Sequence, residues 1–164
     1  MKRYRKLLLP LLLICCLFVT SMPVSAAKSS TTYTTSKVAS KTYKNRWGIK
    51  KISKSDAKLL AQIVYLEARG EGDKGERAVI EVVFNRVNSK KFPNSIKKVL
   101  SQKGQFSTYK YRNKAKVRSK ELRNIYKVLN GDSHILSKKV VFFGTRPYNK
   151  KVELKYKHHY FCRY

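Results

Sequence analysis

The carboxyl group of Glu67 extends a stripe of apolar side chains on a predicted helix. Leu60, Ile63 and Val64 recur at helical spacing, and Glu67 takes the next position on the same face, in the last turn. Partial burial and the negative end of the helix dipole both disfavour the anion and so favour the protonated acid. Cleavage of a glycosidic bond needs such an acid, because the leaving sugar oxygen must receive a proton. The spacing therefore predicts a catalytic acid, with an ion pair to Arg69 at the rim of the core as the alternative.

Few other acids are available as partners for Glu67. Glu71 leaves the helix after a glycine and can face the same cleft. Asp73 and Glu76 open the next predicted helix, where acids suit the positive end of the dipole. Glu81 is either a second catalytic carboxylate or merely a neighbour of Asn85 on that helix. A hydrolase that uses two carboxylates would have to recruit its second one from these four residues.

Other chemistries find little support in the sequence. His134, His158 and His159 lack a carboxylate or cysteine at metal-ligand spacing, and adjacent histidines on a strand point to opposite faces. We therefore expect no metal site and no cofactor. A nucleophile elbow and a glycine-rich phosphate loop are both missing from the sequence, although a Ser–His–Asp arrangement stays open.

The first 26 residues have the pattern of a secretory signal peptide. Four basic residues precede an apolar run at 7–19, and Val24-Ser25-Ala26 provides a small-x-small cleavage site. We expect cleavage near Ala26 and a secreted, cell wall-associated protein. Cys162 is then the only remaining cysteine, so the fold must form without an internal disulfide.

The net charge indicates polyanionic partners. The full chain carries a formal +29; four of its 38 basic residues lie in the signal peptide, which leaves +25 on the rest. Such a charge attracts polyanions and accelerates encounters with them. No nucleic-acid-binding motif is present, so we expect no nucleic acid. Outside a bacterial cell the polyanions at hand are wall teichoic acids and the carboxylates of peptidoglycan, and we expect these as partners. The alternative is that the charge only keeps the protein soluble. We expect a monomer.

The elements that must position these residues begin near Ser55. Residues 27–54 are rich in Ser, Thr and Lys and predict a basic tether to anionic wall polymers. Residues 55–164 predict one domain. Helices are expected over about 55–69, 74–87, 95–100 and 119–130, a loop over 102–116, and a strand at 140–143 with which the tail 152–164 can pair. The fold class is α+β, mainly α, with a small C-terminal β element.

Several blocks of the sequence occur in a characteristic order. They are LAQIVYLEARGE at 60–71, AVIEVVFNRV at 78–87, Phe92-Pro93, QFS at 105–107 and HYFC at 159–162. Together they resemble the spore-cortex-lytic and related cell wall hydrolases, the SleB/CwlJ type, over about residues 55–164. The resemblance implies a lysozyme-like catalytic domain in which the first Glu of the signature, here Glu67, is the catalytic acid.

The resemblance also implies a lytic transglycosylase that acts on peptidoglycan glycan strands. One carboxyl group protonates the bond between muramic acid and glucosamine, then acts as base while the muramic 6-hydroxyl closes a 1,6-anhydro ring. We expect the cleft to be lined by Glu71, Gln105, Phe106, Ser107 and His159. The alternatives are a turn with a core aromatic residue at 105–106 and a structural role for the histidine.

Two positions depart from the family pattern. Glu81 stands where the family usually has a small or apolar residue, and Lys157 replaces a common glycine. Rival functions remain open at this point. They are a hydrolytic muramidase with a second carboxylate, an amidase that cuts the stem peptide, and a cationic wall-binding protein without catalysis.

Overall fold

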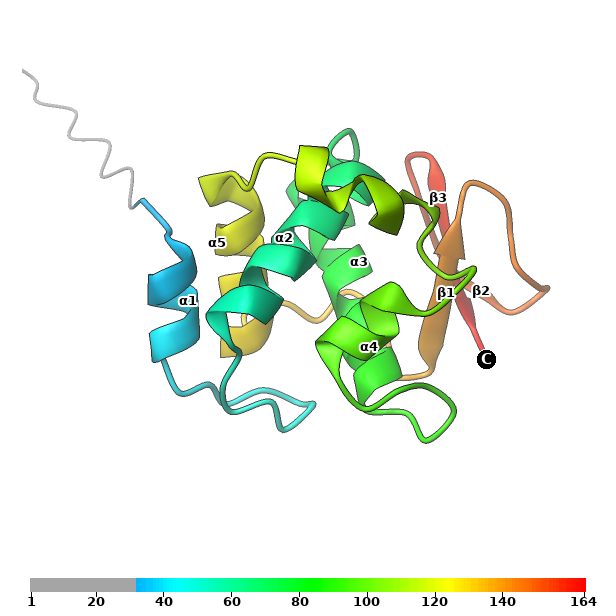
Figure 1. The fold of residues 1–164 in the computed structure, drawn as a ribbon. Helices are drawn as coiled ribbons and strands as arrows, with labels where there is room; N and C mark the ends of the chain where they lie inside the picture. The colour runs from blue at the N-terminus through cyan, green and yellow to red at the C-terminus, as the bar shows by residue number, and fades with distance from the viewer. Residues whose placement is uncertain (1–31) are drawn as a thin grey trace, which may run out of the picture. The chain divides into compact units, whose positions relative to one another are not determined.

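The computed structural model describes residues 32–164, and the predicted signal peptide lies outside the described residues. Figure 1 shows the arrangement of the helices and the sheet. In chain order the elements are α1 (Thr35–Ser40), α2 (Lys54–Ala68), α3 (Gly72–Val87), α4 (Ile96–Ser101), the 3-10 helix η1 (Ser107–Lys114), α5 (Ser119–Asn130), β1 (Val140–Gly144), β2 (Val152–Tyr156) and β3 (His159–Arg163). This confirms the prediction of a mainly helical α+β fold with a small C-terminal sheet.

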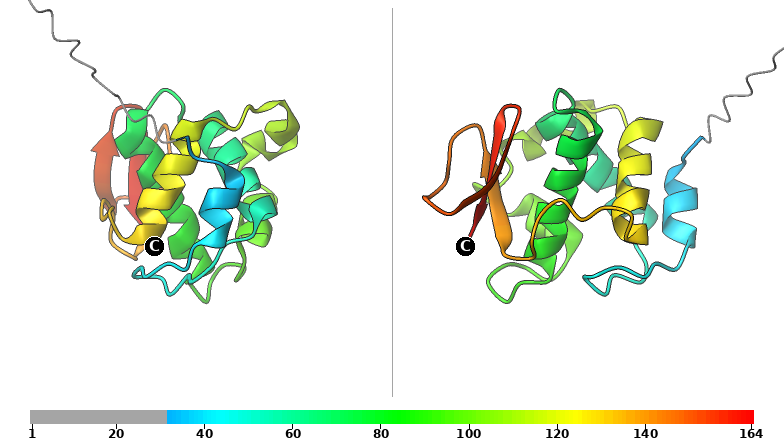
Figure 2. Two further views of the ribbon diagram at one scale, coloured as in Figure 1. Left: turned by 90° about the vertical axis from the view of Figure 1, so that its left-hand side faces the viewer. Right: turned by 180° about the vertical axis from the view of Figure 1, so that it is seen from behind.

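Helix α3 lies in the middle of the fold. The sheet lies on one side of it, and α5 and then α1 lie on the other (Figures 1 and 2). The apolar residues in the middle of this helix are fully buried, which fits its central position: Ala78, Val79, Ile80, Val82, Val83 and Phe84. The geometry of the site therefore depends on the packing of other elements around α3.

The helix ends follow local capping rules. The Ser53 hydroxyl accepts a hydrogen bond from the Asp56 amide, so α2 begins slightly before the predicted start at Ser55. Ser95 caps α4 in the same way, as predicted. Helix α5 spans its predicted residues and ends at Gly131, whose φ of 85° is a left-handed conformation that glycine adopts without strain.

The C-terminal tail forms two strands. The sheet order is β1-β3-β2, with both pairs antiparallel. Phe143 faces Phe161 across the β1–β3 pair, and Tyr156 faces His159 across the tight β2–β3 turn. The predicted pairing of the tail with the first strand is confirmed, and the turn carries the two adjacent histidines to one end of the sheet.

The described part of the predicted tether differs from expectation, because residues 32–54 fold onto the domain. Val38, Tyr43, Trp47 and Ile52 are buried in the core. These side chains follow no hydrophobic period along the segment, yet each is buried by tertiary contact. These buried residues all precede the domain boundary predicted at residue 55. None of the helices within residues 32–164 has the length and apolar character needed to cross a membrane.

The stretch 102–116 is also more regular than the predicted loop. It contains η1, which packs across α2. This contact brings the start of η1 to the last turn of α2, where Glu67 lies.

Candidate active site

Glu67 sits where the apolar stripe of α2 leaves the core. Leu60, Ile63 and Val64 are fully buried, whereas the Glu67 side chain is half-buried at the end of the helix. The hydroxyl of Thr108, near the start of η1, donates a hydrogen bond to Glu67 Oε1. The predicted inward register of Glu67 is therefore present, and its carboxyl group meets solvent from a partly buried position.

A buried arginine interacts electrostatically with this carboxyl group. The Arg86 side chain on α3 is almost fully buried, and its Nε donates to the Val141 carbonyl at 2.7 Å. Its guanidinium carbon lies 5.2 Å from the ring centres of both Phe92 and Phe106. Burial lowers the pKa of Arg86 to about 10, and the charge of Glu67 acts against that shift. Arg86 therefore stays cationic at neutral pH, and its charge attracts that of the Glu67 carboxylate.

Glu71 is held as an anion by the histidine turn of the sheet. Its buried carboxylate accepts the His158 backbone amide at 3.2 Å and lies 2.9 Å from His158 Nδ1. Burial acts to raise the pKa of Glu71, but the hydrogen bonds from His158 and the charges of His158 and His159 outweigh it and lower the pKa. An acid held ionised is a poor proton donor.

His159 lies between Glu71 and an aromatic cluster. Its ring is buried and contacts those of Phe143 and Phe161, with centres 5.4 and 6.0 Å away. Burial lowers the pKa of His159, while the charges of Glu71 and Glu67 act to raise it. The structure thus brings His159 into the electrostatic neighbourhood of both carboxylates.

The QFS block is divided between the core and the surface. Phe106 is buried, and its ring centre lies 5.9 Å from that of Phe143, which matches the alternative of a core aromatic residue. Gln105 is half-buried and Ser107 is exposed. Within the described residues neither side chain hydrogen-bonds to Glu67; Thr108, one position further on, does.

The other candidate carboxylates have structural partners, Asp73 among them, which accepts a hydrogen bond from the Asn124 side chain at 3.2 Å. Glu81 is fully buried; it pairs with Arg46 at 2.8 Å and accepts bonds from the Ser133 hydroxyl and the Leu136 amide. Glu76 is fully buried beside Lys120, and burial raises its pKa. These two groups are therefore occupied inside the fold and do not face a substrate.

Metal coordination finds no candidate in the part of the chain that the structure describes. No group of three or more His, Cys, Asp or Glu side chains there is arranged to hold an ion. Cys162 is buried and unpaired by any disulfide.

Comparison with known proteins places the chain in a family. The sequence profile of the family described as Cell Wall Hydrolase matches residues 70–162, more than half of the chain. The chain belongs to the cell wall hydrolase family. The matched stretch includes Glu71, Arg86 and His159, and it begins three residues after Glu67.

Curated relatives of this cell wall hydrolase are spore cortex-lytic enzymes. That of Bacillus subtilis is 52% identical over 48 residues, which cover 29% of this chain and 16% of the relative. That of Oceanobacillus iheyensis is 42% identical over 55 residues, which cover 34% and 20%. The chain thus matches a fifth or less of the length of these relatives.

Two solved structures share the fold. The catalytic domain of the germination-specific lytic transglycosylase SleB from Bacillus anthracis has a TM-score of 0.60 and 24% identity, covering 68% of this chain and 97% of that domain. The catalytic domain of the Bacillus cereus SleB protein has a TM-score of 0.61 and 25% identity, covering 68% and 91%. The mainly helical domain with its small sheet is therefore that of the SleB catalytic domains.

The departure from the family pattern at Lys157 has a structural counterpart. Lys157 adopts a positive φ of 47° in the β2–β3 turn, a conformation that favours glycine. Its Nζ donates to the Gly70 carbonyl at 3.2 Å, just beyond the end of α2. In this cell wall hydrolase a strained lysine therefore links the histidine turn to the segment that carries Glu67.

Proposed function

We propose that this chain cleaves the bond between N-acetylmuramic acid and N-acetylglucosamine in peptidoglycan, as a lytic transglycosylase with Glu67 as its single acid and base. The observation that carries the proposal is the isolation of Glu67 among the acids of the site. Glu71 is held ionised by His158, and Glu81 is bonded within the core. Within residues 32–164 Glu67 forms no ion pair within 4.0 Å, and its carboxyl group receives one side-chain hydrogen bond, from Thr108.

The reaction needs only this carboxyl group to move protons. Protonated Glu67 gives its proton to the glycosidic oxygen as the bond from that oxygen to the muramic C1 breaks. The resulting carboxylate accepts the proton of the muramic 6-hydroxyl, whose oxygen forms the new bond to C1. The products are a free glucosamine hydroxyl and a 1,6-anhydro-muramic end, no water is consumed, and Glu67 is protonated again.

The neighbours of Glu67 suit both halves of this cycle. Thr108 fixes one carboxyl oxygen, so the other oxygen is free to face the sugar. The buried charge of Arg86 stabilises the carboxylate that exists after the first proton transfer. His159, with its pKa lowered by burial, supplies a polar ring beside the carboxylates without a permanent charge. Gln105 and Ser107 remain candidates for contact with the glycan.

Mass spectrometry of digested peptidoglycan tests the proposal. The wild-type chain should release fragments with 1,6-anhydro-muramic ends, and Glu67→Gln should release none. Asp132→Asn is the matched control, because it removes one negative charge from an exposed loop residue. Ordinary reducing ends, one water heavier, would show a hydrolytic muramidase, and freed stem peptides would show an amidase. Wall lysis that survives in Glu67→Gln would point to a cationic protein without catalysis.

The site of action follows from the same proposal. We infer export by the signal sequence at 1–26, because the substrate lies outside the cytoplasm. The basic surface then holds the enzyme near anionic wall polymers.

A further inference from the structure

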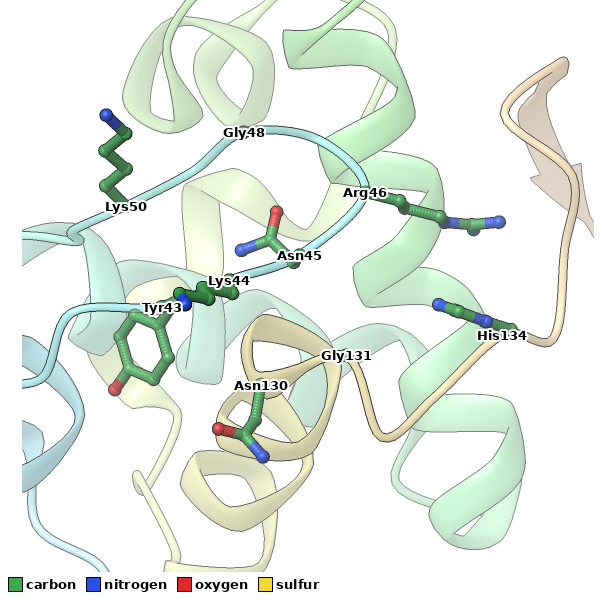
Figure 3. A pocket seen from close by; sticks show the side chains of 9 residues that line it. All are labelled: Tyr43, Lys44, Asn45, Arg46, Gly48, Lys50, Asn130, Gly131 and His134. Carbon is green, nitrogen blue, oxygen red and sulfur yellow. The ribbon is translucent and has the colours of Figure 1, made fainter.

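A second concave site lies apart from Glu67. A pocket of about 580 Å³ is formed by three parts of the chain: the segment from Tyr43 to Lys50, the end of α5 at Asn130 and Gly131, and His134 beyond it. Figure 3 shows the side chains that line it. Neither Glu67 nor any residue from η1 or the sheet is among them. The proposed reaction at Glu67 therefore does not use this pocket.

The lining is cationic. It includes Lys44, Arg46 and Lys50, and it contains no carboxylate side chain. The sequence around it has the same bias, since no acid precedes Asp56 in the whole chain. Glu81 balances the charge of Arg46 at 2.8 Å, so the uncompensated charge of the pocket is that of the two lysines.

The loop that carries the lysines is held in one conformation. Tyr43 N donates to the Lys50 carbonyl at 2.8 Å, which closes the loop at its two ends. The Asn45 amide bonds to the Ile49 and Leu129 carbonyls at 2.8 and 3.0 Å. These bonds fix the backbone that carries the two lysines before any ligand arrives, which lowers the entropy cost of ordering the loop on binding. A plain solvated charge run needs no such framework.

The spacing of the charges suits a ligand with repeated anions. In Figure 3 the Lys50 amine lies toward one end of the pocket, while Arg46 and His134 lie toward the other. The pocket is open to solvent and too large for one small ion, because a water molecule's share of liquid volume is about 30 Å³. A flexible chain that presents anions at intervals can reach both ends at once.

We propose that this pocket binds a poly(polyol phosphate) chain, the chemistry of a teichoic acid, and so holds the enzyme on the wall independently of the glycan site. Phosphodiesters carry a permanent negative charge and several acceptor oxygens, which the lysine ammonium groups can meet. A family member that acts in the wall encounters such polymers wherever teichoic acids are present.

Calorimetric titration with poly(glycerol phosphate) at low ionic strength tests the inference, with the chain carrying Glu67→Gln so that catalysis plays no part. The pocket variant is Lys44→Gln with Lys50→Gln. The control is Lys97→Gln with Lys138→Gln, two exposed lysines that do not line the pocket and give the same change in net charge. We expect the Kd of the pocket variant for the polymer to rise about tenfold, which corresponds to about 1.4 kcal/mol of binding free energy. The Kd of the control variant should rise less than about twofold.

Each outcome decides the inference. A tenfold loss confined to the pocket variant supports it. Equal losses in both variants would mean diffuse attraction by the whole surface, and no measurable binding by the parent chain would remove the site altogether. Titration with a soluble stem peptide distinguishes phosphate from carboxylate. A stem peptide that binds as tightly as the polymer, and with the same dependence on Lys44 and Lys50, would overturn the assignment to phosphate.

Discussion

The buried carboxylate of Glu81 should be a main determinant of stability and dispensable for catalysis. Replacing it with alanine removes the partner of the Arg46 guanidinium. It also leaves three donors of the loop after α5 without an acceptor: the Ser133 hydroxyl and the Ile135 and Leu136 amides, now 2.8–3.0 Å from the carboxylate. Because Glu81 is fully buried, water does not replace it freely. Breaking a buried pair of this kind costs about 3–5 kcal/mol.

This cost translates into a large change in melting temperature. Unfolding entropy of about 2.1 cal/mol/K per residue gives about 0.28 kcal/mol/K for the folded residues 32–164. A loss of about 4 kcal/mol therefore lowers Tm by roughly 14 °C. Thermal unfolding followed by circular dichroism measures the shift directly.

Glu153→Ala provides the matched control for Glu81→Ala. The Glu153 carboxylate also binds the segment before β1, through the Ser137 amide and hydroxyl at 2.6 Å each, but it is partly exposed. Its loss should cost less than about 1 kcal/mol, because water can take its place. Equal Tm values for the two variants would refute this account of Glu81. Glycan cleavage at low temperature should persist in Glu81→Ala, and its abolition in a folded protein would mean that Glu81 is a second catalytic carboxylate.

Three further predictions follow from the site. Thr108→Val should lower kcat for glycan cleavage about tenfold with little change in Tm, because it frees Glu67 from its hydrogen bond; an unchanged kcat would contradict this. The folded-state pKa of Glu71 is lowered, so its contribution to stability is complete above the unfolded value of about 4.3 and is lost as the pH falls through the folded value. As the pH is lowered from 6 to 3, the Tm of Glu71→Gln should therefore fall less than that of the wild type, because the variant lacks the carboxyl group that takes up the proton. Parallel curves of Tm against pH would show that Glu71 makes no such contribution. Lys157→Gly should raise stability by about 0.5–1 kcal/mol by relieving the left-handed φ, whereas a lower Tm would show that the bond to Gly70 matters more.

The parts of the fold that sequence could predict are those with a strong local signal. Helix α5 has a regular apolar period and a glycine stop, and both of its ends were predicted. The register of α2 likewise pointed Glu67 toward the end of the apolar stripe. These signals are carried by neighbouring residues, so no knowledge of tertiary structure is needed to read them.

Other features depend on contacts between distant segments. Val38 and Tyr43 lie in a stretch rich in Ser, Thr and Lys, and only their burial against the rest of the fold shows that the stretch is folded. Thr108 reaches Glu67 because η1 packs across α2, a contact that no local pattern encodes. Arg86 lies inside a matched block, but its burial behind Glu67 is a tertiary property. The bonds of Glu81 to the loop after α5 are likewise a tertiary feature, and the sequence did not indicate them.

The most direct test of the account is the rate of glycan cleavage by Glu67→Gln under single-turnover conditions, with circular dichroism confirming that the variant is folded. Loss of the proton donor should slow cleavage at least about 100-fold, while Tm stays near that of the wild type. A folded Glu67→Gln that cuts glycan strands at the wild-type rate would contradict the claim that this carboxyl group carries the chemistry.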